Sequence, residues 1–282
     1  MTQPAFDVVG IGNALVDVIA HVDDAFLKTH DLVKGAMTLI DAGRADDLYA
    51  RMPPAVEVSG GSAGNTIAGV ASLGGRSAYI GKVCDDQLGR VYRHDIRAAG
   101  VTFDVAAAET GSTGRCLIAV TPDAQRTMQT YLGAGSDLGP EDVDHRLIAN
   151  ASVTYLEGYL WDPPRAKEAF LKAARIAHEA GRRVSLTLSD PFCVERHREE
   201  FLGLVQGHVD VLFANEVEIC SLYQTQTFDE ALQQVRGHCE IAALTRSEQG
   251  AVIVADGEVH VIDAEPVARV VDTTGAGDLY AA

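Results

Sequence analysis

The last eleven residues bring glycines and a carboxylate together where a strand should pass into a helix. The apolar run Val267–Val271 precedes them. They read Asp272-Thr273-Thr274-Gly275-Ala276-Gly277-Asp278-Leu279-Tyr280-Ala281-Ala282. We predict a buried strand, a turn of small residues and a helix that opens at Gly275. The first N–H groups of a helix have no intrahelical partner, and glycine lets a ligand approach them closely. The amides of this turn are therefore suited to binding a phosphoryl group.

Asp278 lies inside the first turn of that predicted helix. The helix dipole favours the ionised carboxylate, which can accept a proton from an attacking hydroxyl. The neighbouring N–H groups would then stabilise the charge on the group being transferred. The alternative is an ordinary first helical turn whose Asp only satisfies the dipole. We favour the catalytic interpretation because other segments of the chain agree with it.

Two further segments carry polar groups beside glycine-rich or turn-forming residues. Gly60 and Gly61 expose backbone amides, and Asn65 offers both a donor and an acceptor at the start of a predicted helix. An ordinary turn with an Asn cap is the alternative. Asp17 follows the first predicted strand, Phe6–Ile11, and should lie near its carboxyl end. An ionised Asp can accept two hydrogen bonds from the vicinal diol of a ribose, although a solvated turn residue is the simpler possibility.

The elements that must position these residues alternate between strand and helix. From Val153 onward the alternation is regular, which predicts a mostly parallel sheet with a ligand site beyond the carboxyl ends of its strands. Residues 101–132 differ, because two short β runs there flank a turn and predict a separate hairpin. A length of 282 residues fits one large α/β domain covering 1–282.

Composition narrows the function classes. The chain has 23 Lys+Arg and 40 Asp+Glu, a formal net charge of −17, which disfavours nucleic acid and anionic membranes as partners. Its five cysteines include no C-x-x-C, so neither a disulfide framework nor a zinc site is expected. The start of the chain has no basic and apolar leader pattern, and no apolar run reaches membrane-spanning length. We therefore expect a cytoplasmic enzyme or binding protein for a small molecule.

The motif D-T-T-G-A-G-D resembles the second signature of the PfkB/ribokinase family, and Gly60 to Asn65 resembles the first. The resemblance implies the ribokinase-like fold, a three-layer α/β/α arrangement around a mostly parallel sheet with a small β lid. It also implies ATP and Mg²⁺, in-line transfer to a hydroxyl, and Asp278 as the base. Gly275, Ala276 and Gly277 would supply the anion hole.

Two more segments resemble family motifs for the nucleotide. Asn215-Glu216-Val217-Glu218 resembles N-x-x-E, which implies nucleotide binding and an indirect role of Glu218 in binding Mg²⁺ through water. A plain capping box fits the same spacing. Thr245 to Gly250 lies where relatives carry T-x-G…G, but Ser247 replaces the first of those glycines. Only Thr245 and Gly250 are therefore carried over as nucleotide-binding residues.

Within the family, G-I-G-N-A-L-V-D and Leu188–Phe192 are most similar to the adenosine kinase subgroup. This similarity implies that Asn13 and Asp17 hold a nucleoside, that Gly60, Gly61 and Asn65 contact its hydroxyls, and that 15–43 and 101–132 form the lid. The expected reaction phosphorylates adenosine to AMP and converts ATP to ADP. A sugar kinase acting on ribose, fructose or a keto-deoxy sugar acid, and a non-catalytic nucleotide or sugar sensor, remain alternatives. A monomer and a homodimer are both compatible with the sequence.

The chain stops just inside the predicted catalytic helix, whereas the resemblance implies several further helices. We expect the 282-residue chain to be a fragment or a degraded copy, and to be unstable or inactive alone. Comparable activity of this chain and of a C-terminally extended form would contradict that expectation.

Overall fold

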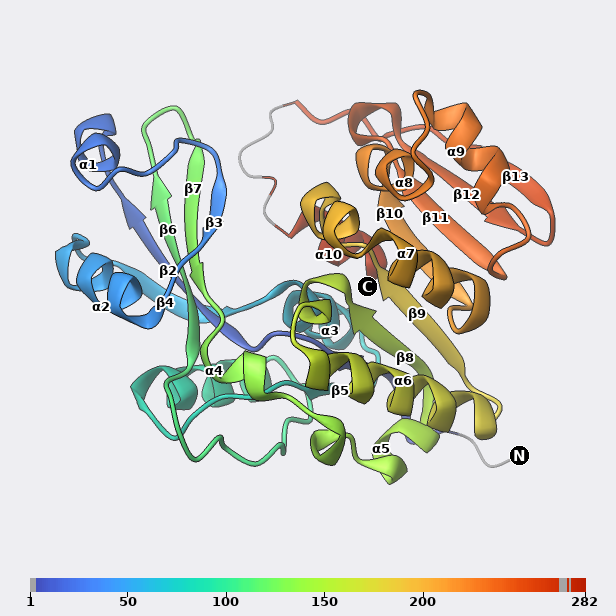
Figure 1. The fold of residues 1–282 in the computed structure, drawn as a ribbon, viewed down its shortest axis with the longest axis horizontal. Helices are drawn as coiled ribbons and strands as arrows, with labels where there is room; N and C mark the ends of the chain where they lie inside the picture. The colour runs from blue at the N-terminus through green and yellow to red at the C-terminus, as the bar shows by residue number, and fades with distance from the viewer. Residues whose placement is uncertain (1–3, 269–272, 274) are drawn as a thin grey trace.

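The computed structural model describes residues 4–268, 273 and 275–282 and contains two β-sheets (Figure 1). The larger sheet has eight strands, and its spatial order is β13 (Glu258–Ile262), β12 (Ala251–Ala255), β11 (Ile241–Thr245), β10 (Val211–Asn215), β9 (Arg183–Thr187), β8 (Ala151–Glu157), β1 (Phe6–Ile11) and β5 (Ser77–Ile80). All neighbouring strands from β5 to β11 are parallel, while β12 and β13 are antiparallel. The expected mostly parallel sheet is confirmed.

The second sheet stands apart, at the left of Figure 1. Its order is β3 (Met37–Leu39), β7 (Arg126–Tyr131), β6 (Gly114–Val120), β2 (Leu15–His21) and β4 (Val56–Gly60). The β6–β7 hairpin matches the expected one, but the sheet differs in two ways from the segments 15–43 and 101–132. It includes β4, which pairs with β2 from outside both ranges, and Thr102 instead bridges to Ala78 of the main sheet. Strand pairing over long separations, which local sequence does not encode, decides both differences.

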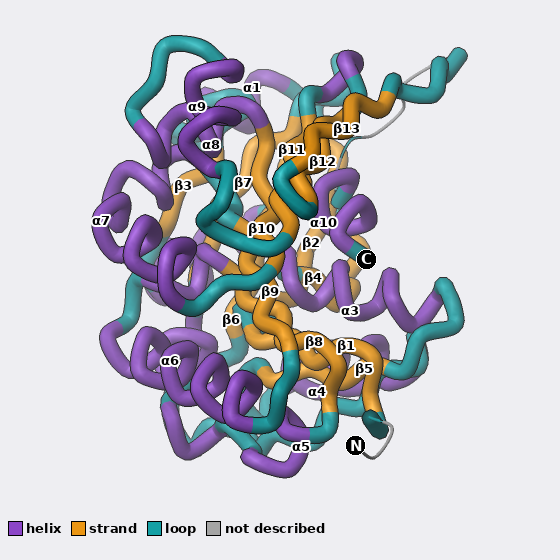
Figure 2. The backbone as a smooth tube through the Cα atoms, turned by 90° about the vertical axis from the view of Figure 1, so that its right-hand side faces the viewer, coloured by secondary structure: helices purple, strands orange, loops and turns teal. Residues whose placement is uncertain are grey.

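Helices cover both faces of the main sheet, which gives the three layers visible in Figure 2. In that view α6 and α7 lie on one side of the sheet, and α3 and α10 lie on the other. The helices are α1 (Asp24–Thr29), α2 (Ala42–Arg51), α3 (Ser62–Ser72), α4 (Gln87–Ala98), α5 (His145–Ala149), α6 (Pro164–Glu179), α7 (Pro191–Gly207), α8 (Glu216–Tyr223), α9 (Phe228–Val235) and α10 (Ala276–Ala281).

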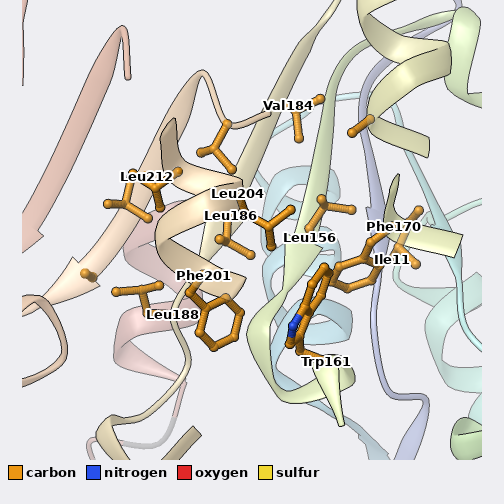
Figure 3. Packing of buried hydrophobic residues seen from close by; sticks show 14 of the residues in the cluster. Ile11, Leu156, Trp161, Phe170, Val184, Leu186, Leu188, Phe201, Leu204 and Leu212 are labelled. Atoms are coloured by element: carbon orange, nitrogen blue, oxygen red, sulfur yellow. The ribbon is translucent and has the colours of Figure 1, made fainter. Parts of the chain in front are cut away.

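The main core lies between the large sheet and α6 and α7 (Figure 3). Trp161 is 4% exposed, and its ring centroid lies 5.6 Å from that of Phe170 and 5.9 Å from that of Phe201. Aliphatic residues of the strands complete this layer, among them Leu156, Leu186 and Leu212. Burial of this apolar surface fixes the sheet whose carboxyl ends carry the site.

Helix α7 begins at Pro191, because Asp190 caps it by accepting a hydrogen bond from Cys193 N and proline suits the first helical position. One expected element needs correction. The strand predicted over Val267–Val271 is absent at residues 267 and 268, while residues 269–271 lie outside the described part of the chain.

Candidate active site

The first turn of α3 holds Asp278. The carboxylate Oδ1 accepts a hydrogen bond from Ser62 Oγ at 2.7 Å, and Oδ2 accepts one from Asn65 Nδ2 at 3.0 Å. Ser62 and Asn65 are three residues apart and therefore share one face of the helix. The structure thus joins the two glycine-rich segments that the sequence singled out. Ser62 was missed as a site residue, although its spacing from Asn65 was a usable signal.

Small residues allow this contact between α3 and α10. A Cβ added at Gly69 would lie 2.8 Å from Ala282 Cβ and 3.0 Å from Leu279 Cδ2, so a larger residue would displace α10. Gly275, the cap residue before α10, has a φ of +70°, a left-handed conformation that favours glycine. A Cβ at Gly277 would meet nothing within 4 Å, which leaves open space at the first turn of α10. Asp272 and Thr274 of the motif lie outside the described residues.

Asp17 and Asp278 influence each other electrostatically. Burial raises the pKa of Asp17 to about 6, and the negative charge of Asp278 adds to the rise, against the lowering effect of Arg126. Burial also raises the pKa of Asp278, although the hydrogen bonds from Asn65 and Ser62 oppose the change. The two carboxylates therefore belong to one partly desolvated site. Arg126, from β7, was missed because nothing in its local sequence indicates that it faces Asp17.

Gly60 and Gly61 are required by close packing around these side chains. A Cβ at Gly60 would lie 2.4–2.6 Å from the carboxyl atoms of Asp17. Gly61 has a φ of +88°, and a Cβ there would lie 2.2 Å from the carbonyl oxygen of Asn13. Both glycines therefore shape the floor of the site, and a side chain at either position would disturb Asn13 or Asp17.

Asn13 is anchored by a buried carboxylate that sequence reasoning missed. Glu157, the last residue of β8, is 1% exposed. Its Oε1 accepts hydrogen bonds from Asn13 N at 3.2 Å and Asn13 Nδ2 at 2.8 Å, and its Oε2 accepts one from Ala63 N at 2.8 Å. Burial raises the pKa of Glu157 to about 7, despite the N–H donors of Ala63 and Asn13. A charged residue at the carboxyl end of a buried strand was the available signal.

A pocket of about 400 Å³ lies beside Asn13. A Cβ at Gly135 would lie 3.0 Å from Asn13 Oδ1, and the residues on both sides of Gly135 line the pocket. Its walls come from the second sheet, the turn after β7 and Gly111 before β6, and they mix apolar and polar residues: Leu39, Ile40, Gly111, Thr130, Tyr131, Leu132, Gly133, Ala134, Ser136 and Asp137. A larger hollow of about 600 Å³ lies outside α8 and α9 and is lined by none of the expected acceptor residues.

Asn215 and Glu218 form a complete capping box at the start of α8. Glu218 accepts from Asn215 N at 2.9 Å and from Asn215 Nδ2 at 2.6 Å, and Glu218 N donates to Asn215 Oδ1 at 2.9 Å. Burial raises the pKa of Glu218 to about 7, and the charge of Asp190 adds to the rise. Both carboxylate oxygens are thus engaged by Asn215, as the capping alternative predicts.

The segment after β11 shows why glycine matters there. Thr245 is the register partner of Asn215, so both lie at the same carboxyl edge of the sheet. Ser247 adopts a left-handed φ of +51°, a conformation that the glycine of relatives accepts without strain. Gly250 has a φ of +80°, and a Cβ there would lie 2.0 Å from the carbonyl oxygen of Ile262. Packing against the end of β13 is therefore enough to explain why residue 250 is a glycine.

The fold and the gathering of residues at the carboxyl edge of the sheet define a ribokinase-like phosphotransferase. Residues 29–282 match the profile of the pfkB family carbohydrate kinases, and the chain belongs to this family. It is an ATP-dependent kinase whose acceptor is a nucleoside or a sugar. In the described part of the chain, no helix is both long and apolar enough to cross a bilayer.

Three known proteins illustrate the similarity. Adenosine kinase from Saccharomyces cerevisiae is 27% identical over 304 residues, covering 100% of this chain and 87% of that protein. A probable sugar kinase from Rhizobium etli CFN 42 superimposes with a TM-score of 0.93 at 56% identity, over 99% of this chain and 85% of that one. The adenosine kinase structure from Sinorhizobium meliloti gives a TM-score of 0.91 at 57% identity, over 98% and 85% of the two chains.

Proposed function

We propose that the chain transfers the γ-phosphoryl group of ATP to the 5′-hydroxyl of adenosine, releasing AMP and ADP. The observation that carries this proposal is that Asp17 and Asp278 influence each other in one site, beside a pocket of mixed polarity next to Asn13. A nucleoside presents a diol, a primary hydroxyl and a flat aromatic base with polar edges, and these three features match the three parts of the site. A free sugar has no counterpart for the pocket.

In the proposed mechanism Asp278 accepts the proton of the attacking hydroxyl while oxygen–phosphorus bond formation proceeds. The amides of Gly275, Ala276 and Gly277 would stabilise the transferred group, for which Ala276 N would have to leave its present acceptor, Thr273 O, at 3.1 Å. Ser62 and Asn65 hold Asp278 in place. Because Asp278 is oriented in this way, reaching the reactive geometry costs less entropy.

Asp17 and Asn13 bind the ribose diol, and Gly60, Gly61 and Asn65 complete the contacts to the acceptor. The adenine ring lies in the pocket, whose walls include Ile40 and Leu132. Its volume of about 400 Å³ lies within the range of small-molecule sites and is large enough for a nucleobase. The name of the yeast relative, adenosine kinase, supports the same acceptor.

ATP binds at the carboxyl edge near Asn215, Thr245 and Gly250 in this proposal. No group of three or more His, Cys, Asp or Glu residues suited to a metal gathers within residues 4–268, 273 and 275–282. A Mg²⁺ ion would take its ligands from phosphates and water, an arrangement common for nucleotide-bound Mg²⁺, and Glu218 would orient one of those waters. When bound, the ion neutralises charge developing on the phosphates.

The second sheet is proposed to act as the lid of a single kinase domain. It supplies Asp17, Arg126 and much of the pocket wall, so closure over the acceptor would remove water from the transfer step. Water excluded in this way cannot compete with the acceptor hydroxyl.

The decisive experiment compares ATP consumption with adenosine, ribose and fructose as acceptors. Turnover experiments use the 282-residue chain, or its C-terminally extended form if the shorter chain shows none. We expect adenosine to give the highest kcat/KM, with AMP as the product. A sugar kinase is the second candidate, favoured by the name of the Rhizobium relative, and preference for a sugar would establish it instead. Acceptor binding without ATP consumption in both forms would indicate a sensor.

Asp278→Asn tests the proposed base. We expect kcat to fall by about 10²–10⁴-fold with little change in acceptor KM, since a general base contributes on that scale. The Asn side chain keeps the size of Asp and can still meet Ser62. Unchanged turnover would remove Asp278 from the mechanism.

A further inference from the structure

Glu157 joins two parts of the site that are far apart in the sequence. One carboxylate accepts two N–H groups from Asn13 and one from Ala63 in the first turn of α3. The same turn of α3 carries Ser62 and Asn65, which hold Asp278. Glu157 therefore connects the loop that binds the acceptor to the helix that holds the base.

A structural cap alone does not account for this arrangement. Gly61, the cap residue of α3, has no side chain to accept from the helix, and Glu157 accepts from Ala63 N in its place. A buried carboxylate is costly, but a side-chain cap at position 61 could not replace it, because a Cβ there would lie 2.2 Å from Asn13 O. The second oxygen of Glu157 is committed to Asn13, which lies outside α3. The chain thus retains a buried acid that also reaches the acceptor loop.

The contact fixes which end of the Asn13 amide faces the acceptor. Only the NH₂ group can donate to a carboxylate, so Nδ2 must point toward Glu157 and Oδ1 must point away. Oδ1 lies toward Gly135, beside the pocket. A carbonyl oxygen in that position accepts a hydrogen bond from an acceptor hydroxyl, whereas the flipped amide would present a donor.

We propose that Glu157 is a positioning residue that orients Asn13 for the acceptor hydroxyl and sets the distance between Asn13 and α3. The proposal rests on the proposed function, because it assumes that Asn13 contacts the acceptor. Glu157 is 1% exposed, and its hydrogen bonds all come from N–H groups of the protein, so its effect on the acceptor is exerted through Asn13.

Glu157→Gln tests the proposal with little change in size. Glutamine has one acceptor oxygen and an NH₂ group, so it cannot accept all three N–H groups, and its own donor must face one of them. We expect the acceptor KM to rise by about 10-fold or more while the KM for ATP stays within about 2-fold, because a donor left unpaired in a buried site costs on that scale. If circular dichroism shows that Glu157→Gln does not fold, Glu157→Asp is used instead. Asp keeps the charge but is too short to span both partners, and the same KM split is expected.

Two further variants separate positioning from a general loss of stability. Asp142→Asn changes another largely buried carboxylate. Its Oδ2 accepts hydrogen bonds from Lys82 Nζ at 2.8 Å and Gly139 N at 2.9 Å rather than from Asn13 or α3, so the variant should lower the melting temperature without changing either KM. Asn13→Ala should raise the acceptor KM, and adding Glu157→Gln to it should change that KM by less than about 2-fold further, because the two act as one unit.

An unchanged acceptor KM in Glu157→Gln would overturn the proposal. An equal rise in the KM values for the acceptor and for ATP would do the same, and so would multiplicative effects of Asn13→Ala and Glu157→Gln in the double variant. All of these KM values are measured with the acceptor that the wild-type protein uses best. A wild-type protein that phosphorylates a sugar rather than adenosine would contradict the proposed acceptor while leaving the test of Glu157 intact.

Discussion

At the scale of single residues, the site concentrates three carboxylates. Burial raises the pKa of Asp17 to about 6 and that of Glu157 to about 7, and it raises the pKa of Asp278 as well. Each group interacts unfavourably with at least one other, since the charge of Asp278 adds to the rise at both Asp17 and Glu157. The folded protein therefore loses stability when these groups ionise.

The pKa of Asp17 gives a prediction with a definite sign. Its folded value of about 6 lies above the ordinary 3.8, so the penalty for ionising it is absent below about pH 4 and complete above about pH 6. Asp17→Asn should therefore raise the free energy of unfolding by about 1–3 kcal/mol at pH 7.5, with the gain vanishing near pH 4. The same variant should raise the acceptor KM. Urea unfolding at pH 4, 6 and 7.5 measures the effect.

Asp7→Asn provides the control of opposite sign. The hydrogen bond from Arg76 holds the pKa of Asp7 below its usual value, so removing this carboxylate should lower stability at neutral pH. A gain in Asp17→Asn that does not vary with pH would show that desolvation of the charge is not its origin.

Ser247 and Gly250 make a matched pair for backbone conformation. Ser247→Gly removes a left-handed serine and should raise the free energy of unfolding by about 0.5–1 kcal/mol, after allowing for the greater freedom of glycine when unfolded. Gly250→Ala should lower it by more than about 2 kcal/mol, because the added Cβ would meet the carbonyl oxygen of Ile262. Thermal unfolding of both variants measures these changes. Stability changes of the same sign and size would contradict the assignment of the two effects to backbone conformation and packing.

At the scale of elements, the contact between α3 and α10 positions the base. Gly69→Val should push α10 away from α3 and loosen the hold of Ser62 and Asn65 on Asp278, because a Cβ already lies too close to Leu279 and Ala282. We expect kcat to fall by about 10-fold or more with a smaller change in acceptor KM, as misplacement of a catalytic group does.

Gly203→Val in α7 is the control for that variant. A Cβ at Gly203 meets nothing within 4 Å, so the replacement adds the same side chain to a helix without a clash. Its kcat should match that of the wild type. A similar loss of kcat in both variants would mean that the effect does not come from the α3–α10 contact.

The elements themselves could largely be predicted from local signals. The strand–helix alternation after Val153, the hairpin of β6 and β7 and the helix that begins after Gly275 all follow from local patterns in the sequence. The short strand Met37–Leu39 and the edge strand Val56–Gly60 were missed, because three to five partly exposed residues carry little periodicity and their pairing is long-range. Local chemistry likewise identified Asp278 and Asn65 but could not reveal that Glu157 meets Asn13, which is 144 residues away.

At the scale of the whole molecule, the site bridges two sheets. Asp17 and most of the pocket belong to the second sheet and the turn beside it, whereas Asn13 follows β1 of the main sheet. Adenosine should therefore slow amide hydrogen exchange in β2, β3 and β7 while leaving β9 and β10 of the main core unchanged, since a ligand stabilises the parts that it joins.

Exchange measured with and without adenosine checks this prediction, with Asp17→Ala as the control that should show no change. Uniform protection of both sheets, or none in the second sheet, would argue against a bridging acceptor and against the proposed lid.

Trp161 is the single tryptophan of the chain, and it lies in the layer between the main sheet and α6 and α7. Intrinsic tryptophan emission therefore reports on that layer and on nothing else. A melting curve followed by this emission will register collapse of the main core, while rearrangement of the second sheet leaves the signal flat. A dye attached at Val56, which is 62% exposed on the edge strand β4, would give the second sheet its own optical signal.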